Sequence, residues 1–187
     1  MFRVKTLLAL SVLAAGDAAS AAESSRYGGW QERSIKALSP EQIEDYLEGR
    51  GMGMALPAEL NGYPGPRHVL ELGDELDLTP DQRARTEQLF EDMRRKAIEL
   101  GEQIVEREAA LDELFASGTA SAAALHETTE ALGRLNGRLR AHHLSYHLAM
   151  RDVLDPFRIE MYSRLQGYAP SDRPGGHRHG HDRHRGQ

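Results

Sequence analysis

The sequence predicts an all-α protein built on one long antiparallel helical hairpin with short flanking helices. The segment from Pro80 to about Phe115 has no further proline, 121–153 has none, and both repeat apolar residues at a spacing of seven. Ser117-Gly118-Thr119 lies between them and is typical of a tight turn. Because the connection is so short, the two helices are expected to pack antiparallel.

The N-terminus predicts export through a secretory signal peptide that covers 1–21. Arg3 and Lys5 supply its positive start, 7–15 is a short apolar core, and Ala19-Ser20-Ala21 is a typical cleavage site. An apolar run of about ten residues is too short for a membrane core that needs about twenty. We therefore expect a periplasmic protein with a cleaved signal peptide and no stable membrane insertion.

Composition narrows the function classes. The chain has 187 residues, a formal net charge of -6 and no cysteine. Without cysteine it has no disulfide framework, thiolate metal site or thiol redox chemistry. An acidic chain lacks the basic face that nucleic-acid binding needs. The sequence also has no catalytic nucleophile motif, no Gly-rich phosphate loop and no HExxH motif. We expect a binding protein and not an enzyme.

Short elements are expected before the hairpin. Residues 22–37 are polar and mixed, which predicts disorder. The helical domain is expected to span 38–168 and to open with a short helix from Pro40 to about Glu48, ended by a glycine. Residues 51–66 are rich in Gly, Met and Pro and are explained only as a wrapping loop. A second short helix is expected at 67–76.

The two long segments carry coiled-coil-like repeats. Arg107 is the polar break in the first segment, and Gly101, Gly133 and Gly137 lie inside the helices, where each permits either a close approach or a bend. A thin hairpin leaves apolar stripes in water, so it needs its flanking helices, a partner chain, or both. The repeat positions are Phe90, Met93, Ala97, Leu100, Ile104, Leu111 and Leu114 in the first segment, and Leu125, Thr128, Leu132, Leu135, Leu139, His142, Tyr146, Ala149 and Val153 in the second.

A capping motif opens the first long helix. Leu78-Thr79-Pro80-Asp81-Gln82 combines an N-cap hydroxyl (Thr79), a proline at the first helical position (Pro80) and a reciprocal amide (Gln82). Leu38-Ser39-Pro40-Glu41-Gln42 keeps every one of these roles. Leu154-Asp155-Pro156-Phe157-Arg158 keeps the cap and the proline but has arginine in place of the reciprocal glutamine.

With these motifs, the stretch from about Val69 to Gly167 resembles the LTxxQ family of bacterial periplasmic proteins, which includes the chaperone Spy, the stress protein CpxP and the zinc-resistance-associated protein. The resemblance implies a curved antiparallel homodimer whose concave face binds clients. It implies a chaperone of the envelope stress response that works without ATP or a required cofactor and binds unfolded or misfolded periplasmic proteins. Asp155 and Arg158 depart from the family's second motif.

Client-binding residues are chosen by position alone. Apolar side chains flanked by charge on a shallow surface can hold an unfolded chain loosely. The alternative is that all of them are buried in the hairpin or in a dimer seam. The chosen residues are Leu89, Phe90, Met93, Ile98, Val105 and Phe115.

A histidine cluster in the second long helix suggests a different function. His143 and His147 are four residues apart, so they share one helix face and can chelate one ion. Imidazole with thioether suits copper, and imidazole with carboxylate suits zinc or nickel. The alternative is that His142 is a seam residue and the others are partly exposed surface. The candidate ligands are His142, His143, His147 and Met150, with Met93, His68, Met52 and Met54 as neighbours that the fold can bring close.

The C-terminal segment 169–187 is rich in His and Arg and is expected to be disordered. It either binds Zn, Ni or Cu or is a solubilising tail with incidental metal affinity. Together with the helical histidines, it supports an alternative function: heavy-metal binding, buffering or sensing, with a membrane sensor as partner. Its histidines are His177, His179, His181 and His184.

Overall fold

The computed structural model describes residues 27–168, and this part of the chain is helical with no strand. The predicted all-α class and the long helix pair are confirmed. The elements are a 3₁₀ turn η1 (Trp30–Glu32) and the helices α1 (Pro40–Leu47), α2 (Leu56–Glu59), α3 (Pro66–Glu71), α4 (Pro80–Ala116), α5 (Ala122–Val153) and α6 (Pro156–Leu165).

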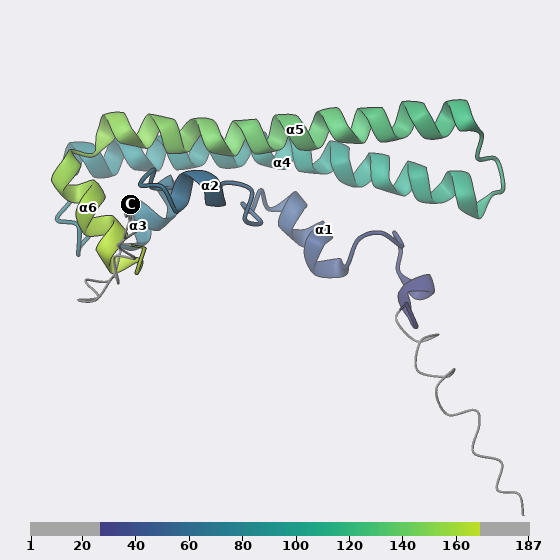
Figure 1. Cartoon of the computed structure of the whole chain (residues 1–187), viewed down its shortest axis with the longest axis horizontal. Coiled ribbons are helices and arrows are strands. Elements are labelled where there is room, and N and C mark those ends of the chain that lie inside the picture. Colours follow the sequence, from purple (N-terminus) through teal and green to yellow (C-terminus); the bar gives the residue numbers. More distant parts are fainter. Residues whose placement is uncertain (1–26, 169–187) are drawn as a thin grey trace, which may run out of the picture.

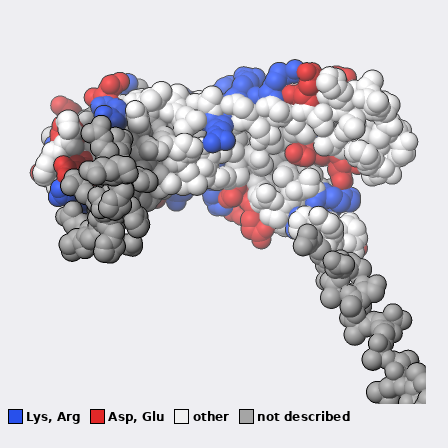
Figure 2. Space-filling view, in the orientation of Figure 1, with Lys and Arg blue, Asp and Glu red and all other residues white. Residues whose placement is uncertain are grey.

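The hairpin of α4 and α5 is the frame of the molecule. The two helices lie antiparallel along their length, α1, α2 and α3 follow one side of the pair, and α6 folds back at the end away from the turn (Figure 1). The turn contains Gly118 with a positive φ of 69°, a conformation that glycine adopts without strain. Charged residues of both signs are scattered along the face seen in Figure 2, while the turn end is largely uncharged.

Helix starts follow the predicted capping chemistry. At α4, Thr79 Oγ1 accepts the Gln82 N–H at 3.2 Å, and Gln82 Oε1 accepts the Thr79 N–H at 3.2 Å. Ser39 and Gln42 form the same reciprocal capping box at α1. At α6, Asp155 alone caps the helix by accepting the Arg158 N–H at 3.0 Å. The third motif is therefore a working cap without the box.

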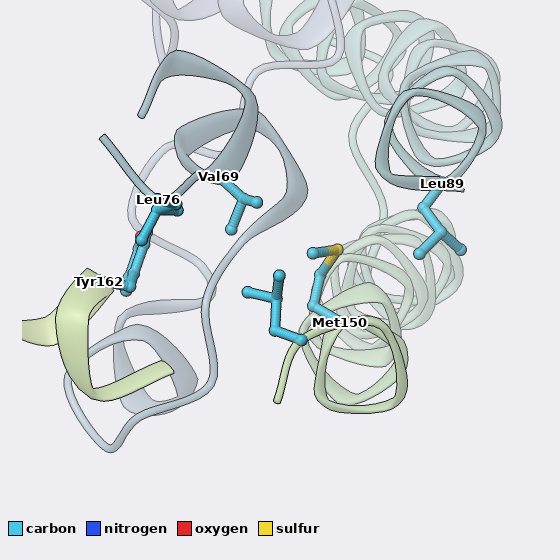
Figure 3. Close-up of a cluster of buried hydrophobic side chains, with 6 residues drawn as sticks. Val69, Leu76, Leu89, Met150 and Tyr162 are labelled. Carbon is cyan, nitrogen blue, oxygen red and sulfur yellow. The ribbon is translucent and has the colours of Figure 1, made fainter. Parts of the chain in front are cut away.

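Two hydrophobic clusters hold the helices together. The end cluster joins α3, α4, α5 and α6 at the end away from the turn, and Figure 3 shows Met150 pointing into it toward Val69. The middle cluster lies halfway along the hairpin. The end cluster consists of Val69, Leu76, Leu89, Met150, Leu154 and Tyr162, and the middle cluster of Ala97, Leu100, Ile104, Leu132, Leu135 and Leu139.

The flanking segments differ from the prediction in three places. The segment 51–66 is not only a loop, because it contains α2. Helix α3 stops at Glu71, well short of the predicted Leu76, because the chain turns at Gly73, whose Cα is covered by the Arg83 guanidinium. Within the described part of 22–37, the prediction of disorder is wrong: η1 forms there and Ile35 is buried.

Among residues 27–168, no helix has both the length and the apolar character of a membrane-spanning helix.

Candidate functional site

The buried face of α5 contains two histidines. From Leu132 to Leu154 the buried positions are on average about 3.7 residues apart, close to a straight helix and not to the 3.5 of a strict heptad. The buried face therefore moves by one residue after Leu139, and His143 and His147 occupy it while His142 and Tyr146 are half-buried. The alternative that His143 and His147 lie partly on the surface is therefore wrong, because both are buried.

A cavity of about 690 Å³, here called the central cavity, lies where the two clusters meet. On α4, Met93 lines it and stands between Leu89 of the end cluster and Ala97 of the middle cluster. The segment that follows α1, together with α3, forms the other wall. The side chains that matter for its chemistry are Met52, Glu59, His68, Phe90, Met93, His143 and His147.

His143 is the residue of this cavity whose buried side-chain nitrogen lacks a hydrogen-bond partner within 27–168. Its side chain is 2% exposed, and its Nε2 has no hydrogen-bond partner among the described residues. Burial, helped by positive charge on His142 and His147, lowers the pKa of His143 to about 4. The ring is therefore neutral at pH 7 and carries a free lone pair. A buried polar atom without a partner costs about 1–3 kcal/mol of stability.

His147 is positioned by a backbone carbonyl. It is 7% exposed, and its Nδ1–H donates to the Tyr63 carbonyl oxygen at 2.7 Å. In the neutral ring the lone pair is then on Nε2. Gly65 lies against this edge of the ring, because a Cβ at position 65 would be 3.1 Å from Nε2 and 2.8 Å from Cε1. A side chain at 65 would therefore collide with the His147 ring.

The carboxylate of Glu59 ties the wall of the cavity to the rest of the molecule. It is 4% exposed, accepts a hydrogen bond from the Tyr162 hydroxyl, and accepts another from the Gly65 N–H at 3.1 Å. The Nδ1 atoms of His68 and His147 lie 3.3 and 3.4 Å from its oxygens. Burial raises the pKa of Glu59, but the hydrogen bonds from His68 and Tyr162 and the positive charge on both histidines outweigh it and lower the pKa. The carboxylate in turn raises the pKa of His68.

Two of the four predicted helical metal ligands lie outside the cavity. His142 donates a hydrogen bond from Nε2–H to the Met93 carbonyl oxygen at 3.0 Å and so connects α5 to α4. Met150 is fully buried in the end cluster, one turn beyond His147. These two assignments are corrected, because each side chain is held by another part of the fold. His143 and His147 do line one cavity with Met93, Met52 and His68. Met52 and Met54 both pack on the middle cluster, but Met54 does not line the cavity.

No group of three or more His, Cys, Asp or Glu side chains in the described part of the chain is arranged to hold a metal ion. The tail histidines His177, His179, His181 and His184 lie outside the described residues.

The predicted client-binding residues differ in how exposed the fold leaves them. Leu89 and Met93 are interior residues and offer no surface to a client. Phe90 lines the central cavity, and Ile98 and Val105 are half-buried. The remaining residue, Phe115, is 61% exposed near the hairpin turn.

An apolar groove of about 290 Å³, unforeseen in the sequence, lies between α2 and α5. Leu148 is 60% exposed at this groove, and the α2 side chains Leu56 and Leu60 are more than half exposed beside it in the chain. The groove is lined by Pro57, Ala58, Tyr63, Leu144 and Leu148.

Sequence reasoning also missed Glu59. It is one carboxylate in Leu56-Pro57-Ala58-Glu59, and nothing in that segment marks it as buried. Its role follows from Tyr162, which lies 103 residues away and meets it only in the folded chain.

Comparison of the chain with protein-family models, with curated proteins and with solved structures found no match.

Proposed function

We propose that this protein is an exported helical binding protein that takes up a transition-metal ion in the central cavity, as a buffer or as a sensor for a membrane partner. The observation that carries the proposal is His143, which lines a cavity of ligand size and whose buried Nε2 has no hydrogen-bond partner among the described residues. A neutral imidazole nitrogen is the commonest metal ligand in proteins.

His147 supports the same proposal. Because its Nδ1–H is held by the Tyr63 carbonyl, its Nε2 is oriented as a ligand nitrogen, the usual arrangement for a metal-binding histidine. His143 and His147 line the same cavity and lie one turn apart on α5. A purely structural pair of core histidines would have both rings satisfied by the protein, and that of His143 is not.

The test separates this cavity from the tail. Zn²⁺, Ni²⁺, Cu²⁺ and, in chloride-free buffer, Ag⁺ are titrated calorimetrically into the metal-free chain from residue 22, and into a variant in which the four tail histidines are replaced by Asn. Stoichiometric binding of at least one ion that survives in the tail variant and is lost in His143→Ala is the expected result. The exposed His126 provides the control, since His126→Ala should bind as the parent does. Binding that disappears with the tail histidines would reject the proposal.

A second candidate function is ATP-independent chaperone activity toward unfolded or misfolded periplasmic proteins. The apolar groove between α2 and α5 favours it, because an unfolded chain can place an apolar side chain there without opening the helix pair. Leu148 is the residue to test. Leu148→Glu puts a charge into the groove at an exposed position, so the fold should survive while suppression of client aggregation is reduced. If suppression is absent in the parent protein, this candidate is rejected.

A further inference from the structure

The chemistry of the central cavity favours one class of metal ion. We infer that, if the cavity binds metal as proposed above, it selects a soft monovalent cation, Cu⁺ or Ag⁺, held by His143 with the thioether sulfurs of Met93 and Met52. Thioether ligands are soft and select Cu⁺, whereas Zn²⁺ and Ni²⁺ gain more from imidazole, carboxylate and water.

Two methionines from different parts of the chain line the same cavity as His143. Met93 comes from the middle of α4. Its backbone carbonyl accepts a hydrogen bond from His142, so this turn of α4 lies beside the part of α5 that contains His143. Met52 comes from the segment after α1. Its two glycine neighbours, Gly51 and Gly53, also line the cavity. Met52, Met93 and His143, from three segments of the chain, therefore line one cavity.

Met52 also has an unusual backbone. Its φ is 45°, in the left-handed region that residues with a Cβ seldom adopt. Such a residue costs about 1 kcal/mol or more and persists only where the surrounding structure enforces it. Glycine would fit this position without strain, as it does at Gly53. The chain instead has Met52 at this strained position, and Met52, unlike Met54, lines the cavity.

The hard oxygen ligands near the cavity are already engaged. Asp45 and Glu48 both pair with Arg50, at 2.8 and 2.7 Å. Glu59 holds the Tyr162 hydroxyl and the Gly65 N–H. A divalent ion that recruited one of these carboxylates would have to break such contacts, whereas neutral nitrogen and sulfur ligands require no such exchange.

The test replaces sulfur without changing volume. Met→Leu swaps keep the packing nearly constant, so we use the chain from residue 22 with the four tail histidines replaced by Asn, and add Met52→Leu and Met93→Leu together. Ag⁺ is titrated in chloride-free nitrate buffer, Cu⁺ under a reductant with a competing chelator, and Zn²⁺ and Ni²⁺ in parallel. Met150→Leu is the matched control, because Met150 is buried but lies outside the cavity.

The expected result is that Ag⁺ and Cu⁺ bind at least tenfold more tightly than Zn²⁺ and Ni²⁺, and that the double Leu variant loses at least tenfold in Ag⁺ affinity while Met150→Leu loses none. If Zn²⁺ or Ni²⁺ binds best, or if the double variant keeps its Ag⁺ affinity, the selectivity inference is wrong and metal binding by His143 still stands. If none of the four ions binds, the proposed metal function itself fails.

Discussion

Gln82 donates a hydrogen bond from its side-chain amide to the carbonyl oxygen of Val153, 3.0 Å away and 71 residues along the chain. The same side chain closes the capping box of α4. One residue thus fixes the start of α4 to the end of α5, at the end of the hairpin where α6 begins. The glutamine of this motif is a tertiary contact as well as a cap.

This double role predicts an unequal cost at two equivalent glutamines. Gln82→Ala removes the bond to Val153 and half of the capping box, so it should lower the free energy of unfolding by about 1–2 kcal/mol. Gln42→Ala removes only half of the matching box at α1 and should cost about 0.5 kcal/mol. Urea unfolding of both variants measures the difference. Equal losses would contradict a tertiary role for Gln82.

Gly101 and Gly137 should respond in opposite directions to alanine. A Cβ at 101 would collide with the Tyr46 carbonyl oxygen, so Gly101→Ala must push α1 away from α4 and should cost about 1–3 kcal/mol. Position 137 has open space in the middle of α5, so Gly137→Ala should stabilise the fold by about 0.5–1 kcal/mol. Chemical denaturation tests both signs, and a stabilising Gly101→Ala would refute the close helix approach.

Because Glu59 accepts hydrogen bonds from both Tyr162 and Gly65, replacing Glu59 should destabilise the fold more than replacing Tyr162. Glu59→Ala leaves the Tyr162 hydroxyl and the Gly65 N–H buried without their acceptor, so it should cost about 2–4 kcal/mol. Tyr162→Phe removes one donor while the carboxylate keeps its other contacts, and should cost about 1 kcal/mol. If Tyr162→Phe is as damaging as Glu59→Ala in thermal unfolding, the carboxylate is not the common anchor.

Asp155 predicts a specific acid sensitivity at α6. Its contacts with the backbone N–H and then the side chain of Arg158 lower its pKa. A carboxyl whose pKa is lower in the folded state stabilises the fold above its unfolded pKa of about 3.9 and loses that contribution as the pH falls. Asp155→Asn keeps an acceptor but cannot titrate, so the stability gap between wild type and variant should shrink below about pH 4.

Urea unfolding at pH 7 and pH 3 measures this gap. Asp152→Asn is the control, because Asp152 is exposed at the end of α5 and caps no helix. A gap that stays constant with pH, or an equal change in the control, would contradict the role of the Asp155 charge.

Local chemistry made most of the fold predictable. Helix starts at Ser39, Thr79 and Asp155 depend on hydrogen bonds within four residues, so the sequence alone indicates them. The hairpin followed from the long proline-free segments and Gly118.

The site was predicted only in part, because it depends on contacts between distant segments. His143 and His147 were identified from their spacing, but the heptad pattern placed His142 in the interior instead, since it assumes a supercoil that α5 does not follow near α6. Glu59 is buried by α6 and the bend at Gly65, which no local pattern reveals. The segment 51–66 becomes intelligible as a cavity wall only when it lies against α4 and α5.

The central claim is that His143 is kept for a ligand at a cost to stability, and His143→Leu tests it most directly. Leucine fills a similar space without an orphaned nitrogen, so the variant should unfold at a higher urea concentration, by about 1 kcal/mol. In the same preparation, with the tail histidines replaced, it should lose metal binding at least tenfold. A variant that is less stable than the parent, or that binds metal unchanged, would contradict the account.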